Sequence, residues 1–263
     1  HCSGVGWELN TAQAVSLWSL FWMGEVGERS RREPILQNEA RERGNLYALA
    51  NIGPFAGALA RLAADDVESA DAELVKLMKS WSQEGYHVQH VTGLFGRVNI
   101  ELYRDSPEAS WSAIQDQWPL LKRSMLLRVQ QVRVFCNHAH ARSALGMAKV
   151  SENPERYLTI AERYARYLEN EDADWSKALA KLVRAGIASR SSDSSGAVKL
   201  LRLSVSELET CEMCLFAAAA RRRLGVLIGG EEGARNVQLA DDWMAAQGVQ
   251  NPVSLTAMHA PGF

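Results

Sequence analysis

The hexapeptide ERGNLY at residues 42–47 carries two charges, breaks at Gly44 and resumes with an apolar helix-forming stretch. Related segments occur at residues 83–88 (QEGYHV) and 122–127 (KRSMLL), and a looser one at residues 209–214 (ETCEMC). The first three are spaced by about 40 residues, which is the length that two helices and two turns occupy in a helical solenoid. The spacing therefore predicts a stack of helical hairpins.

Helix-forming residues dominate the sequence between these segments. Ala, Leu, Arg and Glu are frequent, and no run shows the strict alternation of a half-buried strand over many residues. Glycines such as Gly44, Gly85 and Gly248 are stop signals, and the segments at 105–108 and 151–154 combine capping residues with Pro. The sequence therefore predicts an all-α chain. The expected helices span residues 9–26, 28–43, 45–63, 67–83, 86–104, 107–121, 124–149, 154–170, 174–190, 194–209, 211–228 and 231–247, with a short turn at 252–259.

A stack explains how such hairpins become stable. One amphipathic hairpin cannot bury its apolar face alone, whereas stacking gives each hairpin a neighbour on both sides. We expect about six hairpins in a single domain over residues 1–263. Small residues would allow close helix approach, and we expect most tryptophans to fill gaps between helices rather than contact a ligand.

Composition excludes several classes of protein. Hydrophobic residues make up 47% and charged residues 23% of the 263 residues, which are ordinary values for a soluble folded chain rather than a disordered one. Lys and Arg total 29 against 31 Asp and Glu, so the sequence gives no basic footprint for nucleic acid. The apolar stretch at 15–23 is too short to span a bilayer and lacks the basic flank of a signal peptide. We therefore expect a cytoplasmic protein that uses neither membrane nor nucleic acid.

The cysteines do not form a recognisable reactive or metal-binding motif. Four cysteines in a chain of this length indicate reduced thiols rather than a disulfide scaffold. Cys211 and Cys214 form a C-x-x-C pair, but helix-like sequence flanks it on both sides and no second pair completes a zinc site. Of Cys136, His138 and His140, at most two share one face of a helix. We therefore predict no metal site and no cofactor.

A polar stripe on the expected helix 124–149 is the strongest candidate for a binding site. Gln130, Arg133, Asn137 and His140 are spaced by three, four and three residues, which places them on one side of a helix. Such a stripe in a mostly apolar helix would line a groove, where Arg133 would pair with a carboxylate of a partner. The alternative is that the stripe faces water or makes hydrogen bonds between helices.

The sequence offers no positive sign of catalysis. It contains no Gly-rich nucleotide loop, no kinase signature, no H-E-x-x-H and no G-x-S-x-G. We therefore expect a chain that is not an enzyme. The expected binding surface is the inner, concave face made by the first helix of each hairpin, namely residues 45–63, 86–104, 124–149, 174–190 and 211–228.

Several segments resemble a known family of signalling proteins. They are residues 39–47 (EARERGNLY), 216–225 (FAAAARRRLG), 229–233 (GGEEG), 241–252 (DDWMAAQGVQNP) and 258–263 (MHAPGF). Together they resemble the C-terminal region of large bacterial proteins with an N-terminal serine/threonine kinase domain, a central AAA-like ATPase of the STAND type and a C-terminal tetratricopeptide-like array. The resemblance implies that this chain is a tetratricopeptide-like superhelical array from a larger protein, although its period is about 40 rather than about 34 residues.

The resemblance also implies a role in signal transduction. In such proteins the array acts as a sensor or docking arm, which releases the ATPase switch and then the kinase when a partner binds. We therefore expect a regulatory region that binds a protein or peptide on its concave face and contacts the upstream domains of its parent protein. The alternatives are a self-associating helical scaffold and a sensor of a small molecule or metal that uses His138 or His140.

Overall fold

The chain folds into α-helices joined by short turns, which confirms the predicted all-α class. The computed structural model describes residues 6–53 and 58–263, and within these residues it contains fourteen α-helices, a 3₁₀ turn at Leu126–Arg128 and no strand. The helices are α1 (Gly6–Met23), α2 (Val26–Glu42), α3 (Leu46–Ile52), α4 (Ala58–Ala63), α5 (Val67–Ser80), α6 (Val88–Tyr103), α7 (Pro107–Arg123), α8 (Gln130–Val150), α9 (Pro154–Glu169), α10 (Asp174–Arg190), α11 (Ser194–Thr210), α12 (Cys214–Ile228), α13 (Gly230–Ala246) and α14 (Pro252–His259).

Most predicted helices are present, with three notable differences. The helix predicted over 45–63 is described as α3 and α4, and residues 54–57 between them lie outside the described part. The helix predicted over 124–149 starts later, at Gln130, because Met125 adopts a left-handed backbone with φ of 59° and a 3₁₀ turn follows it. The expected turn at 252–259 is a full helix, α14.

One type of turn recurs between helices. In each of these turns, the second residue after the helix adopts a left-handed conformation. The backbone N–H of the third residue then donates to the carbonyl of the residue five positions before it, as Asn45 does to Ala40. These bonds satisfy carbonyls at the C-terminal end of the helix that have no partner within it, and the left-handed residue turns the chain sharply toward the next helix. The left-handed residues of these turns are Gly44, Asp65, Asp105, Ser192, Glu212 and Gly248. The repeated turn is the local reason why successive helices form hairpins.

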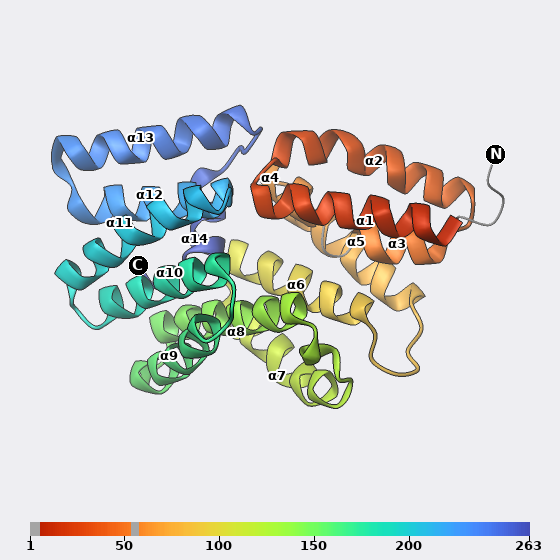
Figure 1. Cartoon of the computed structure of the whole chain (residues 1–263), viewed down its shortest axis with the longest axis horizontal. Coiled ribbons are helices and arrows are strands. Elements are labelled where there is room, and N and C mark those ends of the chain that lie inside the picture. Colours follow the sequence, from red (N-terminus) through yellow and green to blue (C-terminus); the bar gives the residue numbers. More distant parts are fainter. Residues whose placement is uncertain (1–5, 54–57) are drawn as a thin grey trace.

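Successive hairpins pack side by side along a curve (Figure 1). Helices α6 to α13 form four pairs, in which each helix packs against the next, while α1 to α5 form the N-terminal part. The curve brings the first and last hairpins together: the backbone N–H of Gly27, in α2, donates to Oε1 of Gln247, just after α13, at 3.1 Å. The first and last helix pairs of the described chain therefore touch each other.

The C-terminal helix α14 packs inside this curve, against α6 and α12. Three hydrogen bonds hold the backbone of this segment. The N–H of Gln250 donates to the carbonyl of Ala63 at 2.8 Å. The guanidinium groups of Arg142 and Arg223 donate to the carbonyls of Met258, at 3.0 Å, and Ala260, at 2.9 Å. The inner side of the curve is thus partly filled by the chain's own final residues.

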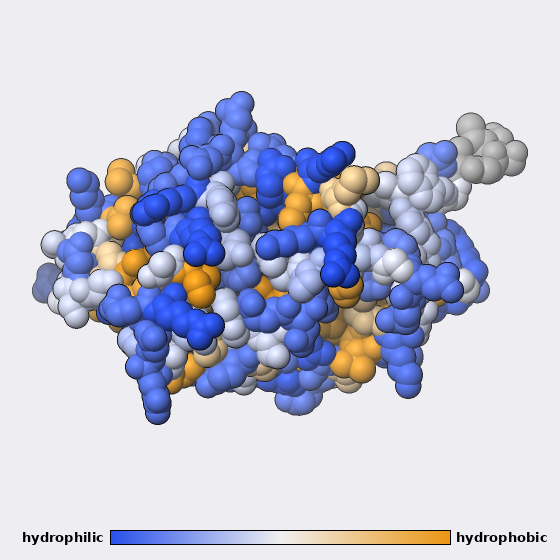
Figure 2. All heavy atoms as spheres, turned by 90° about the horizontal axis from the view of Figure 1, so that it is seen from below, coloured by the Kyte–Doolittle hydropathy of each residue, from blue (hydrophilic) through white to orange (hydrophobic). Residues whose placement is uncertain are grey.

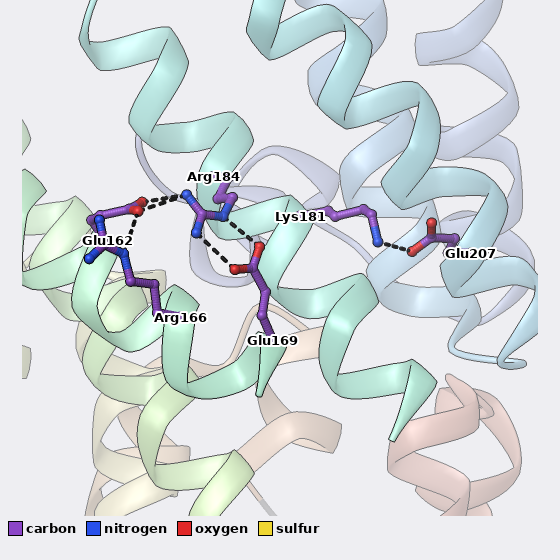
Figure 3. Close-up of polar contacts among 6 residues, drawn as sticks. All are labelled: Glu162, Arg166, Glu169, Lys181, Arg184 and Glu207. Carbon is purple, nitrogen blue, oxygen red and sulfur yellow. Dashed lines mark hydrogen bonds and ion pairs between the residues drawn. The ribbon is translucent and has the colours of Figure 1, made fainter. Parts of the chain in front are cut away.

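Ion pairs connect α10 to the helices on either side of it, α9 and α11 (Figure 3). Arg184 of α10 lies between two carboxylates of α9, at 2.7 Å from Glu162 and 2.6 Å from Glu169. Lys181, one turn earlier, pairs with Glu207 of α11 at 2.7 Å. Because Arg184 binds Glu169 with two nitrogens, this pair has the fork geometry that fixes orientation as well as distance.

The last hairpin requires glycine where α12 meets α13. A Cβ atom on Gly225 would lie 2.6 Å from the carbonyl oxygen of Gly233 and 2.8 Å from the backbone nitrogen of Val237. We expect Gly225→Ala to lower the free energy of unfolding by about 1–3 kcal/mol, because the two backbones must separate and the intrinsic helix preference of Ala offsets only part of that. Urea unfolding checks this. Gly6→Ala, where a Cβ meets nothing within 4 Å, serves as the control.

The surface is polar over most of the face seen from below (Figure 2). Hydrophobic residues appear there in small separate groups rather than as one continuous patch. Among the described residues, no helix has both the length and the apolar character needed to cross a lipid bilayer.

A candidate binding hollow on the inner face

The predicted polar stripe lies along one side of α8, and its first half makes contacts between helices. Arg133 donates through Nε and Nη2 to the two carboxylate oxygens of Glu171, at 2.5 and 2.7 Å. Gln130 donates to the same carboxylate at 3.3 Å. These bonds lower the pKa of Glu171, with the hydrogen bond from Arg133 as the largest cause. The guanidinium that was expected to meet a partner is therefore held by a carboxylate of the chain itself.

The second half of the stripe is buried. Asn137 and His140 are 6% and 4% exposed. The ring of His140 stacks on Tyr164 of α9 at 4.0 Å between centroids and meets the edge of Trp118 of α7 at 4.6 Å. Burial, followed by Lys122 and Arg163, lowers the pKa of His140 to about 3, so the ring is neutral at physiological pH. His140 thus faces α7 and α9, where its Nε2 lies 3.3 Å from Nε2 of Gln115, which corresponds to the alternative of inter-helix hydrogen bonds.

A different side of α8 faces the inside of the curve. Phe135 contacts Trp22 of α1, His138 contacts Phe216 of α12, and Arg142 bonds to α14. Positions 135, 138 and 142 follow the same three-and-four spacing as the predicted stripe. The inward face is therefore displaced around the helix from the predicted one, and the sequence pattern alone did not distinguish the two.

A hollow of about 720 Å³ lies at the N-terminal end of α8. Its walls come from four places in the sequence: the end of α1, the start of α8, the start of α10 and the turn before α12. Three of these are segments of the helices predicted to form the inner face. The lining residues are Ser19, Trp22, Met23, Gln130, Gln131, Phe135, Asp174, Trp175, Cys211, Glu212 and Met213.

Aromatic rings form the wall of the hollow. Trp22 stacks on Phe135 with 4.3 Å between centroids, and Trp175 lies at a tilt 5.8 Å from Trp22. Polar groups line the same hollow, namely the amides of Gln130 and Gln131 and the carboxylates of Asp174 and Glu212. An apolar floor with a few polar groups around it is the usual composition of a ligand pocket.

Two carboxylates, those of Asp174 and Glu212, give the hollow a negative charge. Asp174 is in the first turn of α10, and Glu212 occupies the turn before α12. Burial raises the pKa of the Cys211 thiol, and Asp174 and Glu207 raise it further. The pKa of Cys214 is raised for the same reasons, with Glu25 as its first carboxylate neighbour. Both thiols are therefore protonated at neutral pH, which is the opposite of what a redox C-x-x-C requires.

The other histidine and cysteine residues considered in the sequence are separated by the fold. Cys136 packs with Val91 and Leu121, whereas His138 lies on another side of α8, against Phe216. His140 is enclosed between α7 and α9. Within residues 6–53 and 58–263, no group of three or more His, Cys, Asp or Glu residues is placed to hold a metal ion.

Trp22 and Trp175 pack against the core, as predicted for most tryptophans, but they also line the hollow, which the sequence pattern did not indicate. Trp22 is the last residue but one of α1 and Trp175 is the second residue of α10, so both lie near helix termini, and both are half-buried. The adjacent acidic and aromatic residues Asp174 and Trp175, at the start of a predicted helix, are the part of this arrangement that the sequence itself contains.

Comparison with known proteins returned no match. No protein-family model, no curated protein and no solved structure is similar to this chain. The geometry of the hollow and the arrangement of the hairpins therefore carry the functional argument.

Proposed function

We propose that this chain is a non-catalytic binding array that takes up a segment of a protein or peptide in the hollow between α1, α8, α10 and α12. The observation that carries the proposal is the hollow itself, with Trp22, Phe135 and Trp175 as its wall and amides and carboxylates around them. Its residues come from helices far apart in the sequence, as in repeat proteins that bind partners across their inner face.

The resemblance to bacterial kinase–ATPase signalling proteins supports a regulatory role within this proposal. The repeated hairpins and turns are compatible with a tetratricopeptide-like superhelical array, which we propose as the finer description of the fold. In that role the hollow would be the sensor or docking surface of a cytoplasmic serine/threonine kinase regulatory region. The partner-binding role of Gln130 fits the same proposal, since this residue also lines the hollow.

Self-association is the less favoured alternative. End-to-end stacking of arrays needs two free terminal faces, but Gly27 in the first hairpin bonds to Gln247 at the end of the last one. That contact covers part of the surface which stacking would use. Light scattering of the isolated chain over a range of concentrations distinguishes the two proposals, since only a scaffold gains mass with concentration.

Peptide display tests the binding role. We expect random peptides selected on the intact chain to lose at least about tenfold in affinity when Trp175 is replaced by Ala, because truncating a central aromatic contact typically costs about 2 kcal/mol or more of binding. Trp111→Ala is the matched control: Trp111 is also half-buried, but it packs against His140 and Tyr157 outside the hollow. Selected peptides that bind both variants equally well, with the circular dichroism of both unchanged, would contradict the proposal.

A further inference from the structure

The hollow presents aromatic faces and negative charge together. Its two charged lining residues are Asp174 and Glu212, both acidic, and no Lys or Arg is among the described residues that line it. The remaining polar lining groups are mostly amides, which are neutral. A ligand that enters this hollow therefore meets carboxylates and aromatic rings, and a positive charge is the complement of both.

Two basic side chains lie next to lining residues on α8 and α10, and each already contacts a carboxylate of the chain. Arg133, which lies one turn after Gln130 on α8, is bound through two nitrogens to Glu171. Lys177 contacts Asp174 at 3.3 Å, but the Asp174 side chain is 90% exposed, so this exposed pair is weak and readily exchanged. The carboxylate of Asp174 thus stays accessible to a ligand.

The three rings of the aromatic wall pack against one another and form one cluster. The centroids of Trp22, Phe135 and Trp175 lie between 4.3 and 6.3 Å apart, so one bound group can contact more than one ring. A cation within about 6 Å of a ring face is attracted by the ring quadrupole, and Trp is the strongest such partner. Guanidinium also stacks flat on aromatic rings and pairs with carboxylates in a fork, which an ammonium does not do.

We propose that the hollow recognises an arginine side chain of the bound peptide, with the guanidinium stacked on the aromatic wall and paired with Asp174 and Glu212. The inference rests on the proposed binding function and adds the chemical class of the ligand. Arginine-containing segments of a partner protein would then be selected over otherwise identical neutral ones.

A pair of tripeptides tests the inference directly. The probes are N-acetyl-Ala-Arg-Ala-amide and the same peptide with citrulline, which is nearly isosteric with arginine but uncharged. The readout is the shift of the indole N–H resonances of Trp22 and Trp175 in the intact chain, assigned with Trp→Phe variants. We expect the arginine peptide to move both resonances, with a Kd at least about fivefold lower than that of the citrulline peptide.

The carboxylates have a matched control. Asp174→Asn combined with Glu212→Gln removes two negative charges from the hollow, while Glu152→Gln combined with Glu155→Gln removes the same charge from exposed positions at the start of α9. We expect the first pair to weaken the arginine peptide by about fivefold and the second to leave its affinity unchanged, since exposed pairs contribute modestly and only at short range.

The outcomes separate this inference from the proposed function. Equal affinity for the arginine and citrulline peptides, with both moving the indole resonances, would overturn the arginine assignment and leave a binding hollow of other specificity. Equal weakening by the two pairs of substitutions would show that net charge alone attracts the peptide, which also overturns it. Peptides that shift neither indole resonance, together with failure of the display selection, would remove the proposed function as well.

Discussion

Truncation of Phe216 to Ala should destabilise the chain by about 3–5 kcal/mol, the usual cost of deleting a fully buried aromatic side chain. Phe216 is fully buried in α12 and joins three other parts of the fold. Its ring stacks on Trp22 of α1 at 5.6 Å and meets His259 of α14 at 4.6 Å, and it lies 5.7 Å from His138 of α8. Because the ring contacts α1, α8 and α14 at once, a helix that moved to fill the cavity left by Phe216→Ala would lose its packing elsewhere.

Equilibrium unfolding in urea, followed by circular dichroism, measures this effect. Leu239→Ala on α13 is the control, because that side chain is 52% exposed and its loss should change the free energy of unfolding by less than about 0.5 kcal/mol. A loss below about 1 kcal/mol for Phe216→Ala would mean that the aromatic cluster does not hold α1, α8, α12 and α14 together.

Mild acid should destabilise the chain through its buried histidines. Burial is the first cause that lowers the pKa of His138, His140 and His259 below 6.5, and Arg142 lowers it further for His138 and His259. As pH falls below about 6.5 the unfolded chain takes up protons that the folded chain does not. The stability that these rings contribute is therefore present above about pH 6.5 and is lost below it, by up to about 1.4 kcal/mol per pH unit for each histidine.

One buried carboxylate acts in the opposite direction. Burial raises the pKa of Glu33, although its neighbour Arg29, at 3.2 Å, favours the ionised form. A carboxylate with a raised pKa in the folded state contributes stability as pH falls, so Glu33 offsets part of the loss. Three histidines outweigh one carboxylate, and the net change between pH 7 and pH 5.5 is expected to be destabilising.

Urea titrations at several pH values between 7.5 and 5.5 test this, and a histidine variant isolates the source. His259→Gln should reduce the slope of unfolding free energy against pH by up to about 1.4 kcal/mol per unit, whatever it does to stability at pH 7.5. The slope is the informative quantity, because it counts protons taken up on unfolding. An unchanged slope in the variant would show that His259 titrates alike in the folded and unfolded chains.

Local features of the fold were readable from the sequence because their causes are local. Gly44 and the Pro-containing segments mark turns through the backbone of a few residues, and the helices appear close to where they were expected. The place of α14 was not predictable in this way. Besides α12, it contacts residues more than 100 positions earlier, such as Arg142, which bonds to Met258, and nothing in the eight residues of the helix specifies that partner.

The candidate site shows the same limit. The spacing of Gln130, Arg133, Asn137 and His140 correctly placed them on one side of α8, but spacing does not say which side of a helix faces the inside of an array. That choice depends on the packing of α7 and α9, whose aromatic residues enclose His140. The hollow is assembled from four distant segments, so only the folded chain brings Trp22 next to Trp175.

The contact between the first and last hairpins changes how the chain should come apart. Stacked repeats ordinarily unravel from an end, one unit after another, since each unit touches only its immediate neighbours. Here Gly27 of α2 is bonded to Gln247, and Ala63 of α4 to Gln250, so the N-terminal helices and the residues after α13 hold each other, and neither can fray without loosening the other. The chain should therefore unfold in a single cooperative transition, because the contacts between its two ends must break before either end can separate.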